Sequence, residues 1–199
     1  PIKYHNALME STGVVRDVLR EKRGISDATL KRFLIGWDGE RVTIPIYDEF
    51  SELVNIRRYK WNSYEDSTKM INYEDPVGNA YGEDRIFGIE HLFDKNCPKL
   101  IWCEGEWDRI VAEQAGFPTC TATAGAGNFK AEWFRLLQQK EAVFICYDND
   151  DAGKRATEYM IENLRSAPVK LYVMKWPNDF REKGDITDAF IEYHYAPKE

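Results

Sequence analysis

The sequence predicts an α/β protein in which a mostly parallel sheet flanked by helices is preceded by a smaller mixed α+β subdomain. Two observations carry this prediction. From residue 98 onward, apolar runs of strand length alternate with segments of helical length, the pattern of a parallel sheet with helices on its faces. Before it, two helical segments precede two adjacent strand-like runs. We place the boundary near Cys97-Pro98 and expect domains of 1–97 and 98–199.

The amino-terminal subdomain is expected to begin with two helices. Ser11-Thr12 can cap a helix through Val14–Leu19, with Gly24 just past its end. Ser26 can cap a second, short helix over 27–34. These capping oxygens would accept hydrogen bonds from backbone N–H groups that a first helical turn leaves without an acceptor.

Two strand-like runs come next, at 41–47 and 53–61, and the polar connection between them indicates an antiparallel hairpin. Pro45 lies inside the first run and cannot donate a ladder hydrogen bond. It therefore marks an edge strand or a strand with a bulge. Residues 62–98 are rich in Asn, Asp, Glu, Gly and Tyr, and we expect irregular structure with short strands there.

The second half alternates strand and helix. Gly116 is placed to end the first of these helices, and a glycine-rich loop at 124–128 precedes the second. The expected strands are 99–103, 119–123, 142–147 and 169–174, and the expected helices are about 106–115, 130–139, 151–165 and 186–194.

Composition fits a globular, cytoplasmic protein. The 199 residues are 43% hydrophobic, and no apolar run approaches the roughly 18 residues that span a bilayer. Four cysteines lie far apart without a Cys-x-x-Cys pair, so we expect neither a zinc site nor a disulfide framework. The net charge of −7 counts against nucleic-acid binding over the whole surface but permits a local basic strip. The chain opens at Pro1 without a signal peptide, as expected of a segment of a longer protein.

Acidic residues follow two of the apolar runs at the point where each strand ends. Glu104 comes directly after 99–103, and Asp148 and Asp150 come after 142–147. The carboxyl ends of parallel strands meet at one edge of a sheet, so these side chains are expected together. Clustered carboxylates repel one another unless a divalent cation joins them, which predicts a Mg²⁺ or Mn²⁺ site with these three as catalytic residues. The alternative is that they only cap the helices that follow.

Other residues near these strand ends have more than one interpretation. Glu106 and Asp108 lie in the first turn of an expected helix, where Asp108 is either a supporting partner of the site or an ordinary first-turn acid. The glycine loop that leads to Asn128 and Lys130 is either a tight turn or a place where backbone N–H groups approach a phosphate. Gly153 is expected where the loop packs closely on the start of its helix.

Basic residues gather near the second strand-like run together with stackable rings. That mixture suits a groove for single-stranded nucleic acid, and a solvated edge strand is the alternative. Alternation along a strand sends Arg58 and Lys60 to one face and Arg57 to the other, so we expect the groove to use the first two with Lys69. The basic candidates are Arg57, Arg58, Lys60, Lys69 and Arg85, and the rings are Tyr59, Trp61 and Tyr64.

The acidic motifs resemble a known family. Leu100–Asp108 and Ala142–Gly153, each an apolar strand that ends in acids and a glycine, resemble the Toprim domain of DnaG-type primases, topoisomerases and some nucleases. Arg23–Phe33 and Arg41–Asp48 resemble the amino-terminal subdomain of the primase RNA-polymerase core. The segments most similar to primases of phages and mobile elements are Cys103–Asp108 and Thr121–Asn128.

The resemblance implies a DNA primase catalytic core, which makes short RNA primers from ribonucleoside triphosphates on a single-stranded DNA template. It adds Asp185 and Asp188 to the expected Mg²⁺ or Mn²⁺ ligands, because Toprim primases carry a late Asp-x-x-Asp element there. A helix cap is the competing role for Asp185. Lys69 matches a nucleotide-contacting lysine of the family. The expected protein partner is a replicative helicase, fused or separate, and no membrane is involved.

Two departures keep other functions open. Asn55–Arg58 replaces the glycine-rich strand of cellular DnaG-type proteins, and the sequence contains no zinc-binding or helicase domain of the family. The alternatives are a Toprim-type metal-dependent nuclease and a non-catalytic single-strand-binding module of a primase-helicase. Retention of Glu104, Asp148 and Asp150 argues against a pure binder, which gains nothing from clustered repelling acids.

Overall fold

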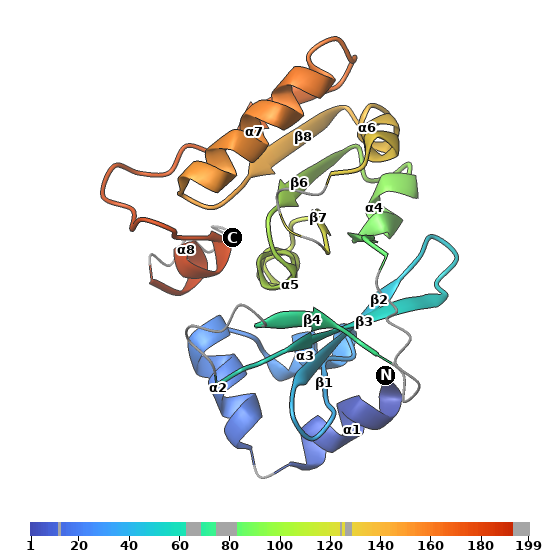
Figure 1. Ribbon diagram of the computed structural model, residues 1–199, viewed down its shortest axis with the longest axis vertical. Coiled ribbons are helices and arrows are strands. Elements are labelled where there is room, and N and C mark those ends of the chain that lie inside the picture. Colours follow the sequence, from blue (N-terminus) through green and yellow to red (C-terminus); the bar gives the residue numbers. More distant parts are fainter. Residues whose placement is uncertain (12, 63–68, 75–82, 124, 126–128, 193–199) are drawn as a thin grey trace. The chain divides into compact units, whose positions relative to one another are not determined.

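A computed structural model of the chain, shown in Figure 1, describes residues 1–11, 13–62, 69–74, 83–123, 125 and 129–192. It divides into two compact units, Pro1–Glu83 and Asp84–Glu199. The division falls before the predicted boundary at Cys97-Pro98. The reason is that β5 (Ile86–Phe87) pairs with β7 (Thr119–Ala122) of the second unit, so the segment after Glu83 belongs to that unit.

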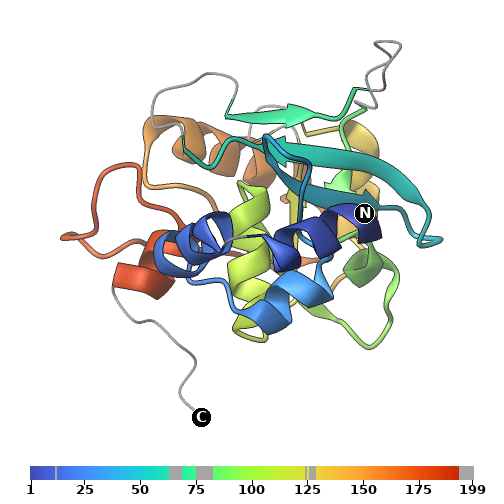
Figure 2. The ribbon, with the colours of Figure 1, turned by 90° about the horizontal axis from the view of Figure 1, so that it is seen from below.

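The first unit is a four-stranded antiparallel sheet with three helices gathered on one side of it, as Figures 1 and 2 show. Its strands follow the order β1-β2-β3-β4. Buried apolar side chains of the helices and of the second strand, including Leu8, Leu19, Leu30 and Ile44, fill its core. The elements are α1 (Ile2–Glu10), α2 (Val14–Arg23), α3 (Asp27–Arg32), β1 (Gly36–Trp37), β2 (Val42–Tyr47), β3 (Leu53–Tyr59) and β4 (Met70–Asn72).

Two features of the helices differ from the prediction. Helix α1 was not expected, and Ser11 belongs to its carboxyl end, where its Oγ donates to the Leu8 carbonyl at 2.8 Å. Gly13, in the left-handed conformation, precedes α2 instead of a side-chain cap, and Thr12 lies outside the described residues. The predicted cap of α3 is confirmed, since the Thr29 N–H donates to Ser26 Oγ at 3.2 Å.

The predicted hairpin is confirmed, because β2 and β3 pair antiparallel. Strand β1 pairs only with Val42 and Thr43, so Pro45 lies beyond it on that side of β2. The register shifts between Ile46 and Tyr47, one residue after the proline. Pro45, which lacks a backbone N–H, thus lies close to a bulge in its strand, one of the two arrangements expected from the sequence.

The second unit is the predicted mostly parallel sheet flanked by helices. Strand order is β5-β7-β6-β8-β9, and every pair is parallel except β5 with β7. Helix α4 falls in the stretch expected to be irregular. The remaining elements are α4 (Ile89–Phe93), β6 (Lys99–Cys103), α5 (Glu106–Gln114), α6 (Ala131–Leu137), β8 (Ala142–Cys146), α7 (Asp151–Leu164), β9 (Lys170–Val173) and α8 (Ile186–Glu192).

Both faces of this sheet are covered at the carboxyl ends of β6 and β8, whereas Phe144 in the middle of β8 is 40% exposed. On one face, Trp102 and Ile145 pack in a cluster with apolar residues of α6 and α7 such as Leu137 and Met160. On the other, Cys103 and Cys146 pack with Ala112 of α5 and Ile186 of α8. The strand ends of β6 and β8, from which the next segments begin, are therefore buried. Among the described residues, no helix is both long and apolar enough to cross a membrane.

Candidate active site

The predicted acids on β6 and β8 come together because the two strands end side by side. Cys103 and Cys146 are the last paired residues of the parallel ladder, so Glu104 and Asp148 follow at neighbouring positions of the same sheet edge. The backbone N–H of Asp148 points to Glu104 Oε2 at 3.4 Å. The structure therefore brings Glu104 and the backbone of Asp148 together at this sheet edge.

Asp150 lies at the start of α7, where it also caps the helix. Its Oδ1 accepts a hydrogen bond from the Gly153 N–H at 2.8 Å. Gly153 is needed here for space, because a Cβ on it would lie 2.3 Å from the carbonyl oxygen of Asp148. The close approach that the sequence suggested for this glycine is therefore present, and it keeps Asp148 and Asp150 in one tight turn.

Asp185 is brought to the same edge by Asn149, a residue that the sequence analysis did not single out. The Asn149 N–H donates to the Gly184 carbonyl at 2.9 Å, and its carbonyl accepts from the Lys183 N–H at 3.0 Å. Its Nδ2 donates to the Arg181 carbonyl at 3.1 Å. The middle residue of Asp-Asn-Asp therefore ties the segment before α8 to the turn that carries the acids.

The Asp185–Asp188 pair forms a reciprocal cap on α8. The Asp188 N–H donates to Asp185 Oδ1 at 2.7 Å, and the Asp185 N–H donates to Asp188 Oδ2 at 3.1 Å. Asp188 Oδ2 also contacts Arg181 Nη2 at 2.6 Å. The capping role weighed for Asp185 is thus real, and Asp188 is engaged by Arg181.

Asp108 extends the acidic group from the first turn of α5. Its side chain is buried, and Oδ1 accepts two hydrogen bonds from Thr187, one from the backbone N–H at 3.1 Å and one from Oγ1 at 3.0 Å. Thr187 was not predicted, since its hydroxyl carries no charge and its partner is distant in the sequence. Glu106 is also buried.

The carboxylates lie close enough together that their charges raise the pKa values of Asp148 and Glu104. Burial raises the pKa of Asp148 to about 9, and the charges of Asp108, Glu104, Asp185 and Asp150 add to the rise. Burial also raises the pKa of Glu104; the Asp148 N–H opposes the rise, and the Asp150 and Asp185 charges add to it. The carboxylates gather without converging on a point: among the described residues, no three His, Cys, Asp or Glu side chains are close enough to hold a metal ion.

A cavity of about 520 Å³ opens beside Asp150. It lies between the first turn of α7 and the segment before α8, so it adjoins the acidic group. Three cations, Lys154, Arg155 and Lys183, contribute to its lining together with the acids Asp151 and Glu182. Cations next to a cluster of carboxylates could hold the phosphates of a ligand whose charge the acids alone would repel.

The two predicted arginines of β3 contact different partners, as strand alternation requires. Arg58 Nε contacts Asp38 Oδ2 at 2.6 Å, and its Nη2 contacts Glu40 Oε2 at 3.4 Å. Arg57 Nη1 donates to Asn72 Oδ1. Arg58 is therefore held in an ion pair with acids of its own unit, a contact that the predicted groove did not anticipate.

The two predicted lysines of this unit lie around Tyr59 and the strand end. The Lys60 N–H donates to the Lys69 carbonyl at 2.8 Å, and Lys69 Nζ lies 5.9 Å from the centre of the Tyr59 ring. Arg23 donates to the Tyr59 hydroxyl at 2.9 Å, a cation that the sequence analysis missed. Tyr64 lies outside the described residues.

The remaining basic candidates belong to the second unit. The Arg85 N–H donates to Thr123 Oγ1 at 3.0 Å, just before β5. Lys130 precedes α6, with Nζ 5.6 Å from the centre of the Trp133 ring. Asn128 lies outside the described residues.

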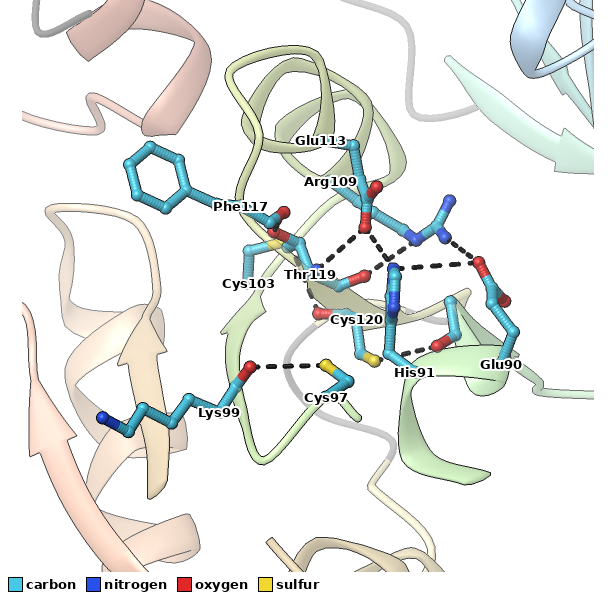
Figure 3. Close-up of polar contacts among 11 residues, drawn as sticks. Glu90, His91, Cys97, Lys99, Cys103, Arg109, Glu113, Phe117, Thr119 and Cys120 are labelled. Carbon is cyan, nitrogen blue, oxygen red and sulfur yellow. Dashed lines mark hydrogen bonds and ion pairs between the residues drawn. The ribbon is translucent and has the colours of Figure 1, made fainter. Parts of the chain in front are cut away.

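A second charged network, drawn in Figure 3, holds β7 to α4 and α5. Glu113 accepts from the Thr119 N–H at 3.0 Å and also contacts His91. Arg109 donates to the Thr119 carbonyl at 2.9 Å and pairs with Glu90. Both backbone polar groups of Thr119 are thus held by side chains.

Known proteins resemble both units. Residues 101–190 match the family model described as Toprim-like. The chain is 30% identical to the DNA primase of Campylobacter jejuni over 119 residues, which are 58% of this chain and 19% of that protein. It is 27% identical to the DNA primase of Aquifex aeolicus over 193 residues, 94% of this chain and 35% of that protein. The chain thus spans about a fifth to a third of the length of these curated relatives.

Solved structures share the fold over nearly the whole chain. The zinc-binding and RNA polymerase domains of the Aquifex aeolicus primase match with a TM-score of 0.75 and 21% identity, covering 96% of this chain and 55% of that one. The primase fragment of the bacteriophage T7 primase-helicase protein matches with a TM-score of 0.64 and 21% identity, covering 86% and 67%. Both units are therefore arranged internally as in primase catalytic cores.

Proposed function

We propose that this chain, whose residues 101–190 form a Toprim-like domain within a primase-type fold, is the catalytic core of a DNA primase. It would join ribonucleotides into short primers on a single-stranded DNA template. The observation that carries the proposal is the gathering of Glu104, Asp148, Asp150 and Asp185 at one edge of the parallel sheet, inside the segment that matches the Toprim-like family.

The chemistry of the donor set fits a divalent cation. These four side chains offer only carboxylate oxygens, the ligands that Mg²⁺ and Mn²⁺ prefer. Their mutual repulsion, visible in the raised pKa of Asp148, would be offset by an ion that draws them together. When bound, such an ion would lower the pKa of the primer 3′-hydroxyl and neutralise the leaving pyrophosphate.

The residues of this chain would supply binding and orientation. Glu104, whose pKa is raised by burial, would accept a proton at the sheet edge. Lys154, Arg155 and Lys183 of the adjoining cavity would attract the triphosphate of the incoming nucleotide. Arg85, Lys130 and the loop with Asn128 remain candidates for further phosphate contacts.

Nucleic-acid contacts are proposed for the first unit. Lys60 and Lys69 lie next to Tyr59 on a strand end, the combination of cation and ring that single strands favour. Arg58 is a poorer candidate than its position suggested, since Asp38 and Glu40 already neutralise it. Related solved structures include a DnaG catalytic domain bound to single-stranded DNA and the primase fragment of a bacteriophage primase-helicase. We extend both partners, template and helicase, to this chain.

The direct test is incubation with single-stranded DNA, labelled ribonucleotides and Mg²⁺ or Mn²⁺. A primase yields short RNA ladders, a Toprim-type nuclease yields shortened DNA, and a single-strand-binding module yields neither. Asp148→Asn should abolish the ladder, and the matched control Glu158→Gln, an exposed acid of α7 outside the cavity lining, should keep it. DNA shortening without RNA synthesis would overturn the proposal.

A further inference from the structure

We infer that Asp108 and Thr187 form a positioning pair that holds Asp185 at the acidic site, and that Asp108 is not a metal ligand. The inference rests on the proposed function, because it divides the acids of the same site into two roles. It assigns a role to Thr187, a residue without charge, and it concerns the geometry of α5 and α8, which lie side by side in Figure 1.

The first turn of α8 is closed by three carboxylates. The N–H of Asp188 is taken by Asp185, the N–H of Asp185 by Asp188, and the N–H of Thr187 by Asp108. Two of these caps are local, but the third comes from α5, 79 positions earlier in the chain. Only this third bond ties the start of α8 to another element that carries the site.

The Asp108–Thr187 contact is buried and doubly bonded. Asp108 is 5% exposed and Thr187 is 1% exposed, and Oδ1 accepts from both the N–H and the hydroxyl of Thr187. The other carboxylate oxygen, Oδ2, lies next to Gly105, where an added Cβ would come within 3.0 Å of it. A buried carboxylate oxygen that accepts two hydrogen bonds from Thr187 is suited to hold that residue in place.

Asp185 is clamped on both sides in sequence. Gly184 before it is hydrogen-bonded to Asn149 of the Asp148–Asp150 turn, and Thr187 after it is hydrogen-bonded to Asp108. Helix α8 has seven residues, too few to hold its own position without tertiary contacts. Losing the Thr187 hydroxyl bond would leave only the backbone N–H bond to Asp108, which weakens one side of the clamp and lets Asp185 move from Glu104 and Asp148.

The test measures Mn²⁺ binding to the full chain by calorimetry, beside thermal unfolding. Thr187→Val removes one buried hydrogen bond and no charge, and we expect about tenfold weaker Mn²⁺ binding, with Thr187→Ser within about twofold of wild type. The control Thr119→Val also removes one buried threonine hydroxyl bond, 2.8 Å long, away from the acids. It should lower the unfolding temperature comparably without weakening Mn²⁺ binding.

A second pair of variants separates positioning from ligation. Asp108→Asn keeps an oxygen that accepts from Thr187, whereas Asp108→Ala removes it, so the alanine variant should bind Mn²⁺ clearly more weakly than the asparagine variant. Equal losses in the two variants, or wild-type affinity in Thr187→Val, would overturn the positioning pair while leaving the proposed function standing. A folded wild-type chain that binds no Mn²⁺ would overturn both.

Discussion

Asp148→Asn tests the electrostatic description of the site without any substrate. The pKa of Asp148 in the folded chain is raised to about 9, from 3.8 in an unfolded chain, with burial as the first cause and the neighbouring acids as the second. Between these values the folded chain keeps a proton that the unfolded chain has lost. Stability in metal-free buffer must therefore fall as pH rises through this window.

The size of the effect follows from the shift. A pKa difference changes the free energy of unfolding by about 1.4 kcal/mol for each pH unit inside the window. From pH 5 to pH 8, the wild type should lose up to about 4 kcal/mol relative to Asp148→Asn, which has no proton to release. We treat this as an upper limit, because Asp148 keeps some contact with solvent.

The measurement is urea unfolding at several pH values in the presence of a chelator. The curves of free energy against pH should diverge for wild type and Asp148→Asn, with the variant more stable at high pH. Asp151→Asn is the control, since its side chain is 84% exposed and its curve should run parallel to that of the wild type. Excess Mg²⁺ should raise wild-type stability at pH 8 and leave Asp148→Asn nearly unchanged. Parallel curves for wild type and Asp148→Asn would refute the reasoning.

Three further outcomes are expected. Lys60→Ala should weaken binding to all single-stranded sequences alike and reduce the slope of log affinity against log salt by about 0.7. Titration at several salt concentrations measures this slope, and Arg58→Ala should change it less, because Arg58 is paired with Asp38. Gly153→Ala should cost about 1–3 kcal/mol in urea unfolding, because its Cβ would meet the Asp148 carbonyl; an unchanged midpoint would contradict the close approach. Glu113→Ala should lower the free energy of unfolding by about 2–3 kcal/mol, because it leaves the buried Thr119 N–H without its acceptor. A loss below about 0.5 kcal/mol in calorimetric unfolding would contradict this role of Glu113.

The parallel sheet could be predicted because its signals are local. Strand β6 occupies the predicted residues 99–103, and the ends of β8 and α7 differ from prediction by a residue. Apolar runs that stop at an acid or a glycine need no information from elsewhere in the chain. The same locality explains why Glu104 and the Asp148–Asp150 turn could be placed at one sheet edge.

What escaped prediction depends on contacts between distant residues. Helix α1 begins without a side-chain cap, and its place is set by contacts such as His5 with the Ile35 carbonyl. Arg58 looked available for DNA, but Asp38, 20 positions earlier, neutralises it. Thr187 has no local signal at all, since its role exists only once α5 and α8 are packed. The hydrophobic pattern predicts the helices and strands, whereas the partners of buried polar groups are known only once the tertiary structure is known.

The acids of the site come from positions 104, 148, 150 and 185, so no short segment of the chain contains the whole site. Because these strands are parallel, the chain between them must close a long loop that includes a helix before the acids can meet. Closing such a loop costs conformational entropy and makes this a slow step of folding. A chain in which β8 has not yet paired with β6 would have no assembled carboxylates. Cation capture during refolding should consequently appear late, together with completion of the sheet, and can report on the last stage of folding.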